Sequence, residues 1–185
     1  MDFTITSYKS LLAALQSNGY AFQTFKNFLD SPKSKTIILR HDVDLLPQNS
    51  LRFAKIQSEM GVKGVYYFRA VPESWDEAII KEIADLGHEV GYHYENMDTA
   101  YTKLKVKSKK LKVEKNSRGY DDLLDLAYED FCVNLERLRK LVPVNTICMH
   151  GSPRSNFDNK ELWGKYDYRS LGIIGEPYYD VNFDE

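Results

Sequence analysis

The sequence predicts an α/β fold in which a predominantly parallel sheet has helices on its outside. Segments rich in β-branched and aromatic residues alternate along the chain with amphipathic segments, in which apolar residues recur every three or four positions. Strands that alternate with helices in this way pair in parallel, and their sheet is either open or closed as a barrel. The 185 residues, 43% of them hydrophobic, suffice for one domain with a sizeable core.

These patterns predict five strands and four main helices. Three of the helices end at a glycine, which is typical of helix C-termini: Gly19, Gly61 and Gly87. The longest helix carries apolar residues, Phe131 among them, at three- and four-residue intervals, so we expect one of its faces to be buried. The strands are expected at residues 35–44, 62–70, 88–95, 144–151 and 170–183, and the helices at residues 6–20, 48–61, 73–87 and 119–142.

Composition and charge narrow the class of protein. The net charge of −2 creates no overall field that would favour nucleic acid or an anionic membrane. No apolar run approaches the ~20 residues that a membrane span needs, and the polar N-terminal stretch MDFTITSYKS does not resemble a signal peptide. Cys132 and Cys148 stand in apolar contexts without metal-ligand spacing and are expected to be buried free thiols. We therefore expect a cytoplasmic protein that neither binds nucleic acid nor spans a membrane.

Polar side chains suited to chemistry recur where the expected strands end. In parallel α/β folds, function collects at the carboxyl ends of the strands. Four strand endings of this kind are hard to attribute to chance, so we expect one site at that edge of the sheet. The residues concerned are Asp42 and Asp44, Arg69, His93 and Glu95, and His150.

The two aspartates in the stretch ILRHDVD, residues 38–44, are the most informative of these residues. Alternation along a strand places Asp42 and Asp44 on one face. Two like charges held close repel, and the pKa of one carboxyl rises unless a cation lies beside them. Such a pair therefore indicates a metal ion, a shared proton or a solvated turn, in which aspartates cap the following loop or helix.

The order of the motifs resembles the polysaccharide deacetylase family, the nodulation-protein-B-like carbohydrate esterases. HDVD at residues 41–44 and GHEVGYHYE at residues 87–95 carry the resemblance. HGSPRSNFDN at residues 150–159 and GIIGEPYYD at residues 172–180 are similar to a subgroup associated with surface-polysaccharide biosynthesis of the O-antigen type. The resemblance implies a distorted (β/α) barrel that holds a divalent metal, usually zinc, and removes an acetyl group from a sugar. It also implies that Asp42 is the general base and that Asp44 binds the metal.

The remaining ligands depart from the family pattern. The family has two metal-binding histidines four positions apart, and the first corresponds to His93. Met97 stands at the second position, and a thioether is a poor ligand for such an ion. Glu95, on the same strand face as His93, or His150, at the end of the next strand, is expected to replace the missing histidine. Asp98 is a more distant alternative.

Two further histidines, two arginines and a basic stretch are the remaining polar features of the sequence. His88 is expected to stabilise a helix C-terminus, and His41 to pack in the wall behind the aspartates. Arg69 and Arg154 are candidates for substrate binding: the loop that holds Arg154 lines the sugar site in the family, although a plain surface loop is an equal alternative. The basic stretch at residues 103–118 could bind an anionic sugar phosphate or nucleic acid, but a solvated hairpin or insertion fits it better.

Family members continue beyond the segment that corresponds to residues 172–180, and their later strands close the barrel and carry a general-acid histidine. We therefore expect a single domain over residues 1–185 with an incomplete barrel, whose open edge a second copy of the chain would cover.

Three functions follow as alternatives. The first is a metal-dependent deacetylase that acts on an amino sugar or another saccharide precursor, such as a nucleotide sugar, in surface-polysaccharide biosynthesis. The second is a metal-dependent hydrolase of phosphate esters or other amides, and the third is a catalytically impaired carbohydrate-binding relic.

Overall fold

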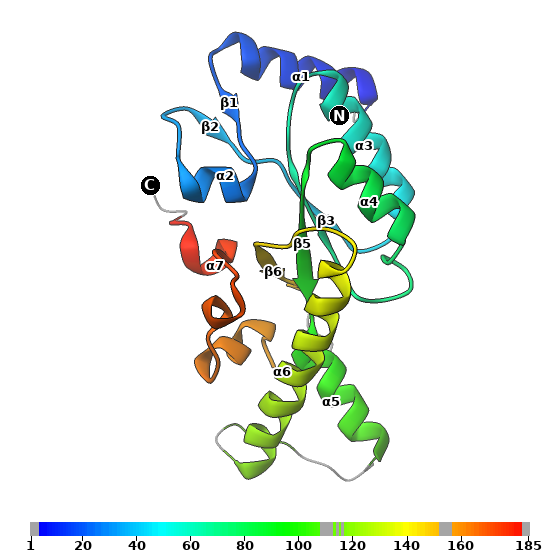
Figure 1. Ribbon diagram of the computed structural model, residues 1–185, viewed down its shortest axis with the longest axis vertical. Coiled ribbons are helices and arrows are strands. Elements are labelled where there is room, and N and C mark those ends of the chain that lie inside the picture. Colours follow the sequence, from blue (N-terminus) through cyan, green and yellow to red (C-terminus); the bar gives the residue numbers. More distant parts are fainter. Residues whose placement is uncertain (1–3, 108–112, 114, 116, 152–156, 183–185) are drawn as a thin grey trace. The chain divides into compact units, whose positions relative to one another are not determined.

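The computed structural model describes residues 4–107, 113, 115, 117–151 and 157–182 (Figure 1). The chain divides into two compact units, Met1–Gly91 and Tyr92–Glu185, which are described separately below. The expectation of a single domain stays a prediction. No helix in the described ranges has the length and apolar character that crossing a membrane requires.

The first unit contains two sets of parallel strands with helices between them. Strand β1 pairs with β2, and strand β3 pairs with β4, both in parallel. Strand β5 begins in this unit, where the Glu89 N–H donates to the Gly64 carbonyl at 3.0 Å. Helices α3 and α4 end before Gly61 and Gly87, which adopt φ angles of +68° and +83°. The elements are α1 Ile5–Ser17, β1 Ala21–Phe22, α2 Phe25–Asp30, β2 Thr36–Ile37, β3 Arg40–Val43, α3 Pro47–Glu59, β4 Val65–Phe68, α4 Glu77–Asp85 and β5 Glu89–Tyr94.

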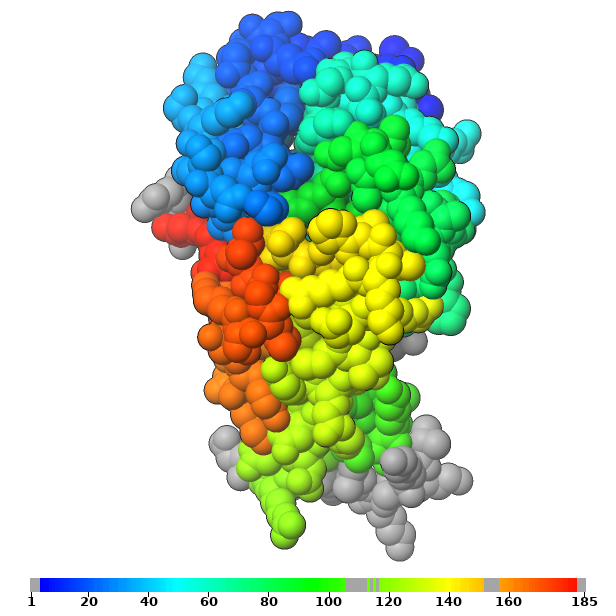
Figure 2. Space-filling model, viewed as in Figure 1, coloured from blue at the N-terminus to red at the C-terminus, as the bar shows by residue number. Residues whose placement is uncertain are grey.

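The second unit contains the end of β5, where Tyr92–Tyr94 pair in parallel with β6, Ile147–Met149. The strand order is β3-β4-β5-β6, and the pairs β3–β4 and β5–β6 are parallel. In Figure 2 the segment from η1 to α7, coloured orange to red, lies against α6, coloured yellow to green. The ring of Tyr166 stacks on Tyr128 of α6 at 3.8 Å, which agrees with that view. The remaining elements are α5 Asn96–Lys107, α6 Arg118–Arg139, η1 Asn159–Gly164, η2 Tyr168–Leu171 and α7 Pro177–Asp180.

The core of the second unit forms on the inner face of α6. Phe131 is fully buried and contacts three rings, those of Tyr92, Tyr94 and Trp163, with centroid distances of 5.2, 5.7 and 4.9 Å. This confirms the long helix with one apolar face that the sequence predicts. The buried residues of α6 are Leu123, Leu124, Ala127, Phe131, Leu135 and Leu138.

The strand expected at residues 35–44 is in fact two strands in two sheets. The Ile37 carbonyl accepts a hydrogen bond from Gln23 N–H beside β1, at 3.1 Å. The Leu39 carbonyl accepts one from Val65 N–H at the start of β4, at 2.9 Å. The chain therefore changes pairing partner at Ile38, and an unbroken apolar run hides such a change because it reports burial and not partner identity.

The fifth strand expected at residues 170–183 is wrong for the described part of that range. A single parallel bridge joins Thr146 to Gly175, and the chain then turns into α7. Pro177 has no N–H for a ladder but suits the first position of a helix, and Glu176 caps that helix through Tyr178 N–H. The fully buried Glu176 carboxylate also accepts the Met149 N–H of β6 at 3.0 Å, so a side chain covers this strand edge in place of a strand.

The basic stretch contributes a helix that the sequence patterns did not reveal. Residues 103–107 belong to α5, so a hairpin is the wrong interpretation for this part of the stretch. Lys103 extends from α5 to Asp130 of α6, with an Nζ–Oδ1 distance of 2.6 Å. The remaining residues of the stretch up to position 112 lie outside the described residues.

A buried polar cluster lies behind β3 in the first unit. Gln57 is fully buried, and its side chain accepts the Tyr66 hydroxyl at 2.8 Å and donates to the Tyr8 hydroxyl at 2.7 Å. Its amide nitrogen also contacts His41 Nε2 at 2.6 Å, and the His41 ring stacks on Tyr66 at 4.4 Å. Since the Gln57 amide nitrogen is a donor, His41 Nε2 accepts and the imidazole is neutral. His41 therefore packs in the wall, as the sequence predicts.

We expect this cluster to make the protein less stable in mild acid. Burial and the neighbouring His88 lower the pKa of His41 to about 4, against the opposing charge of Asp42. Because the unfolded chain then binds more protons between pH 4 and about pH 6.5, stability is complete above that window and falls as the pH drops through it. The free energy of unfolding should fall by about 2–3 kcal/mol from this group, as measured by urea denaturation. His41→Phe should flatten the dependence; an unchanged slope would assign it to other groups.

Candidate metal centre

The end of β3 presents Asp42 beside a cation. Arg40 and Asp42 stand two positions apart on the strand, so their side chains share a face. The Arg40 guanidinium donates to Asp42 Oδ2 at 2.8 Å, and both side chains are partly exposed, at 31% and 27%. The sequence patterns did not indicate a role for Arg40, although its two-residue spacing from Asp42 is the same as that between the two aspartates.

Asp44 lies in the loop after β3 and is held through its main-chain carbonyl. The Arg69 guanidinium donates to the Asp44 carbonyl at 3.3 Å, and the buried Ser74 hydroxyl bonds both the Arg69 N–H and the Val43 carbonyl. Leu46, next in the loop, has a left-handed conformation with φ of +53°, which costs roughly 1–2 kcal/mol for a residue with a Cβ. The first unit therefore fixes the turn that follows the DVD motif at some energetic cost, and Arg69 is part of that support.

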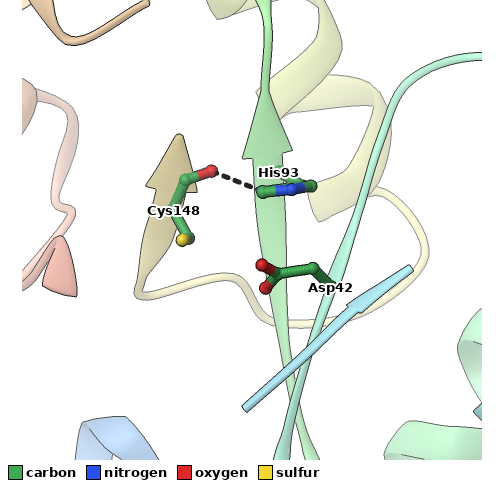
Figure 3. Close-up of side chains that lie close together, drawn as sticks. All are labelled: Asp42, His93 and Cys148. Atoms are coloured by element: carbon green, nitrogen blue, oxygen red, sulfur yellow. Dashed lines mark hydrogen bonds between the residues drawn. The ribbon is translucent and has the colours of Figure 1, made fainter. Parts of the chain in front are cut away.

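His93 on β5 is oriented by a backbone carbonyl. Its side chain is 1% exposed, and its Nδ1 lies 2.9 Å from the Cys148 carbonyl of β6, as the dashed line in Figure 3 shows. A carbonyl only accepts, so Nδ1 carries the proton and Nε2 carries the lone pair. Metal-binding histidines in proteins are oriented by this kind of bond to the other ring nitrogen. His93 thus has the tautomer that a ligand needs.

His150, at the end of β6, places a second imidazole against this lone pair. Its Nδ1 lies 3.3 Å from His93 Nε2, and the two rings are nearly perpendicular, at 89°. Two nitrogens that each lie ~2.0–2.1 Å from a tetrahedral zinc are separated by about 3.3–3.4 Å. The two nitrogens therefore have a separation that suits two ligands of one ion.

A buried amide positions His150. Asn159 of η1 is fully buried, and its Nδ2 donates to the His150 carbonyl at 3.1 Å. Its Oδ1 accepts the N–H of Met97 at the start of α5, also at 3.1 Å. The His150 N–H donates in turn to the Tyr94 carbonyl at 2.9 Å. Both main-chain groups of His150 are thus bonded, and Asn159 is a positioning residue that the sequence patterns did not identify.

The other predicted site residues are placed differently. Glu95 is partly buried at the end of β5, and its carbonyl accepts the Thr99 N–H inside the first turn of α5. Asp98 is buried in that same turn. His88 belongs to the core of the first unit, where Gly64 N–H donates to its Nδ1 and its Nε2 donates to the Ala54 carbonyl. Both ring nitrogens of the buried His88 are thus bonded within this core, so the histidine is structural. Arg154 lies outside the described residues.

The described residues offer two sets of ligand types that suit zinc. One set is Asp42, His93 and Cys148, and the other is Asp44, His93 and His150. Nitrogen, sulfur and carboxylate oxygen are the donors that zinc binds, so the chemistry of both sets fits this ion.

Comparisons with known proteins identify the fold. No family model and no curated protein matches the chain. The structure of IcaB from Ammonifex degensii resembles it with a TM-score of 0.55 and 14% identity, over 92% of this chain and 74% of that chain. A family 4 carbohydrate esterase from Bacillus anthracis has a TM-score of 0.47 and 15% identity, over 95% of this chain and 70% of that chain. The likeness to IcaB confirms the predicted fold class, a parallel sheet with outer helices in an incomplete barrel.

Proposed function

We propose that this chain is a member of the polysaccharide deacetylase superfamily, a metal-dependent hydrolase that removes an acetyl group from an amino sugar or another saccharide precursor. The observation that carries the proposal is the pair of imidazoles, His93 with its proton fixed on Nδ1 and His150 with a nitrogen 3.3 Å away. The DVD motif after β3 and the fold shared with IcaB support it. The surface-polysaccharide pathway and a cytoplasmic location belong to the same proposal.

In this proposal Asp44, His93 and His150 hold a zinc ion, with Glu95 or Cys148 as an alternative ligand. The carboxyl ends of parallel strands meet at one edge of a sheet. Asp44 and His150 directly follow β3 and β6, and His93 lies near the end of β5, in the strand order β3-β4-β5-β6. Zinc, when bound, lowers the pKa of its water to ~7 and polarises an acetyl carbonyl.

Asp42 is the general base in the proposed reaction. Its carboxylate takes the proton of the attacking water, and the Arg40 guanidinium holds its Oδ2 in place at 2.8 Å. Water adds to the acetyl carbon, and the proton taken by Asp42 passes to the sugar nitrogen or oxygen as its bond to that carbon breaks. Acetate and the free sugar amine or hydroxyl are the products. Arg69 and Arg154 bind the saccharide or nucleotide-sugar substrate in this proposal, and Arg69 also supports the Asp44 loop.

Metal analysis and a substrate panel test the function. The purified chain should contain close to one zinc per molecule by plasma mass spectrometry, and a chelator should remove it. N-acetylated sugars should yield free amine and acetate only after zinc is restored, whereas p-nitrophenyl phosphate should not react. Hydrolysis of the phosphate ester instead would favour the alternative hydrolase. Saccharide binding with neither metal nor turnover would favour the binding relic.

Asn159→Ala should weaken metal binding without unfolding the second unit. The substitution removes the amide that holds His150, and loss of such supporting groups costs about 10–100-fold in metal affinity. Competition with a zinc chelator measures the affinity directly. Asn134→Ala is the matched control, because Asn134 bonds Asp130 on α6 and should leave zinc affinity unchanged. Equal affinities in both variants would show that Asn159 does not position a ligand.

A further inference from the structure

A pocket lined largely by aromatic side chains lies among the elements that follow His150 in the chain. Its volume is about 340 Å³, in the range of small-molecule sites. All of its lining residues belong to the second unit, and none is among the candidate metal ligands. They are Trp163, Tyr166, Asp167, Tyr168, Arg169 and Tyr179.

The rings of the pocket are fixed by contacts behind them. The Trp163 indole donates from Nε1 to the Tyr94 hydroxyl at 2.9 Å and meets Tyr168 edge to face at 5.3 Å. Tyr166 stacks on Tyr128 with an angle of only 4° between the rings, and its hydroxyl donates to Asp125 at 2.6 Å. A ligand would therefore meet rings that are already ordered, which lowers the entropy cost of binding.

The pocket has charged groups of both signs. The Arg169 guanidinium lies over the Tyr168 ring at 4.7 Å and pairs with Asp180 at 2.5 Å. Asp167 adds a second carboxylate, which caps η2 through the Arg169 N–H at 2.8 Å. Asp167 and Arg169 line the pocket with opposite charges, and Asp180, which is not in the lining, pairs with Arg169. No excess of positive charge favours an anion, so the pocket suits a neutral ligand that both gives and accepts hydrogen bonds.

Tyr179 supplies the exposed wall. Its side chain is 50% exposed, and its hydroxyl donates to the Lys160 carbonyl at 3.1 Å, which fixes the ring at the rim. A pyranose ring has one face of C–H groups, which packs on an aromatic ring, and a rim of hydroxyls, which bond to carboxylate and guanidinium groups. The combination of rigid aromatic walls with Asp167 and Arg169 matches both properties.

We propose that this pocket binds one sugar ring of an oligosaccharide, at a site separate from the metal centre. Trp163 bonds Tyr94, whose side chain points to the opposite face of β5 from that of its neighbour His93. A sugar bound in this pocket would not be the sugar whose acetyl group is removed. The ligand that the two sites can share is therefore a chain of several sugars and not a single sugar. The inference rests on the proposed carbohydrate substrate, but it concerns binding and not turnover.

Calorimetric titration with the β-1,4-linked tetramer of N-acetylglucosamine tests the pocket. The full chain carries His93→Ala and is kept free of metal, so that the candidate metal centre is disabled. Saturable binding is expected, and Tyr179→Ala should weaken it about tenfold because the ring is lost. Tyr179→Phe keeps the ring and should bind as the parent does. Tyr178→Ala is the matched control, since Tyr178 is similarly exposed, at 43%, on the same short helix but does not line the pocket.

The outcomes separate this inference from the proposed function. No saturable binding by the parent, or equal losses in Tyr179→Ala and Tyr178→Ala, would overturn the sugar pocket whatever the enzyme does. Tyr179→Ala in the zinc-loaded chain should slow deacetylation of the tetramer more than deacetylation of monomeric N-acetylglucosamine. If tetramer binding is lost in Tyr179→Ala but kept in Tyr178→Ala, and no variant shows deacetylation, the result would support the pocket and count against the deacetylase.

Discussion

Asp44→Asn is expected to abolish both zinc binding and turnover, whereas Asp42→Asn should keep the metal and lose turnover by ~10²–10⁴-fold, the usual worth of a general base. The difference follows from the proposed roles. A neutral amide is a poor substitute for a carboxylate ligand, and it cannot take a proton from water. Zinc content by mass spectrometry and acetate release from an N-acetylated sugar measure the two properties independently.

Asparagine is nearly isosteric with aspartate, so both variants should fold. Circular dichroism and a thermal melt provide that control. Arg40→Gln is a further comparison, because it removes the partner of Asp42 Oδ2 while leaving the base itself. It should lower turnover less than Asp42→Asn does. If both aspartate variants bind zinc and hydrolyse substrate like the parent, the two carboxylates have only a structural role.

Phe131→Ala should destabilise the second unit by about 3–5 kcal/mol, the usual cost of truncating a buried phenylalanine. The ring is fully buried and has Tyr92, Tyr94 and Trp163 around it, so its loss leaves a cavity that rigid aromatic neighbours cannot fill. Guanidinium denaturation, followed by circular dichroism, measures the change in the free energy of unfolding.

Val133 supplies the matched control on the same helix. Its side chain is 67% exposed, and Val133→Ala should change stability by no more than about 0.5 kcal/mol. A loss below about 1 kcal/mol for Phe131→Ala would mean that the aromatic cluster is not the core of this unit.

The elements that the sequence predicted well are those with a long, regular pattern. Helix α6 repeats its apolar positions over six turns, and the structure buries the same face. Helix α4 combines the capping aspartate Asp76 with Ile79, Ile80 and Ile83 on its inner side. Such segments carry their own boundaries and orientation, so a single sequence is enough to place them.

The failures share a different cause, because each depends on a partner that is distant in sequence. The break at Ile38 reflects pairing with β1 on one side and β4 on the other. The absent fifth strand reflects Pro177 and a side chain that takes over a backbone bond. Helix α5 has no continuous apolar stripe, and its contact with Asp130 depends on an ion pair across to α6. Apart from Pro177, these causes are contacts between residues far apart in the sequence, which local patterns do not show.

In the candidate site, too, local motifs were sufficient for some residues, whereas others depend on contacts that are distant in sequence. His93 could be chosen from its motif, and its tautomer is consistent with a ligand. The choice of His150 over Glu95 as its neighbour depends on how β6 registers with β5, where His93 pairs with Cys148. Asn159 acts through buried bonds to two main-chain groups far away in the chain. A motif can indicate a candidate ligand but not the residues that position it.

The buried carboxylate of Glu176 has a consequence for the order in which the protein forms. It satisfies the Met149 N–H of β6 from 27 positions further along the chain. A ribosome that adds ~5–20 residues per second therefore leaves this strand edge open for roughly one to five seconds. Throughout that interval the nascent chain exposes an unpaired strand, which is the kind of surface that chaperones shield and that neighbouring nascent chains can join. The exposure ends when Glu176 and Pro177 have emerged from the ribosome, because the first bonds to the strand edge and the second prevents the segment from extending the sheet.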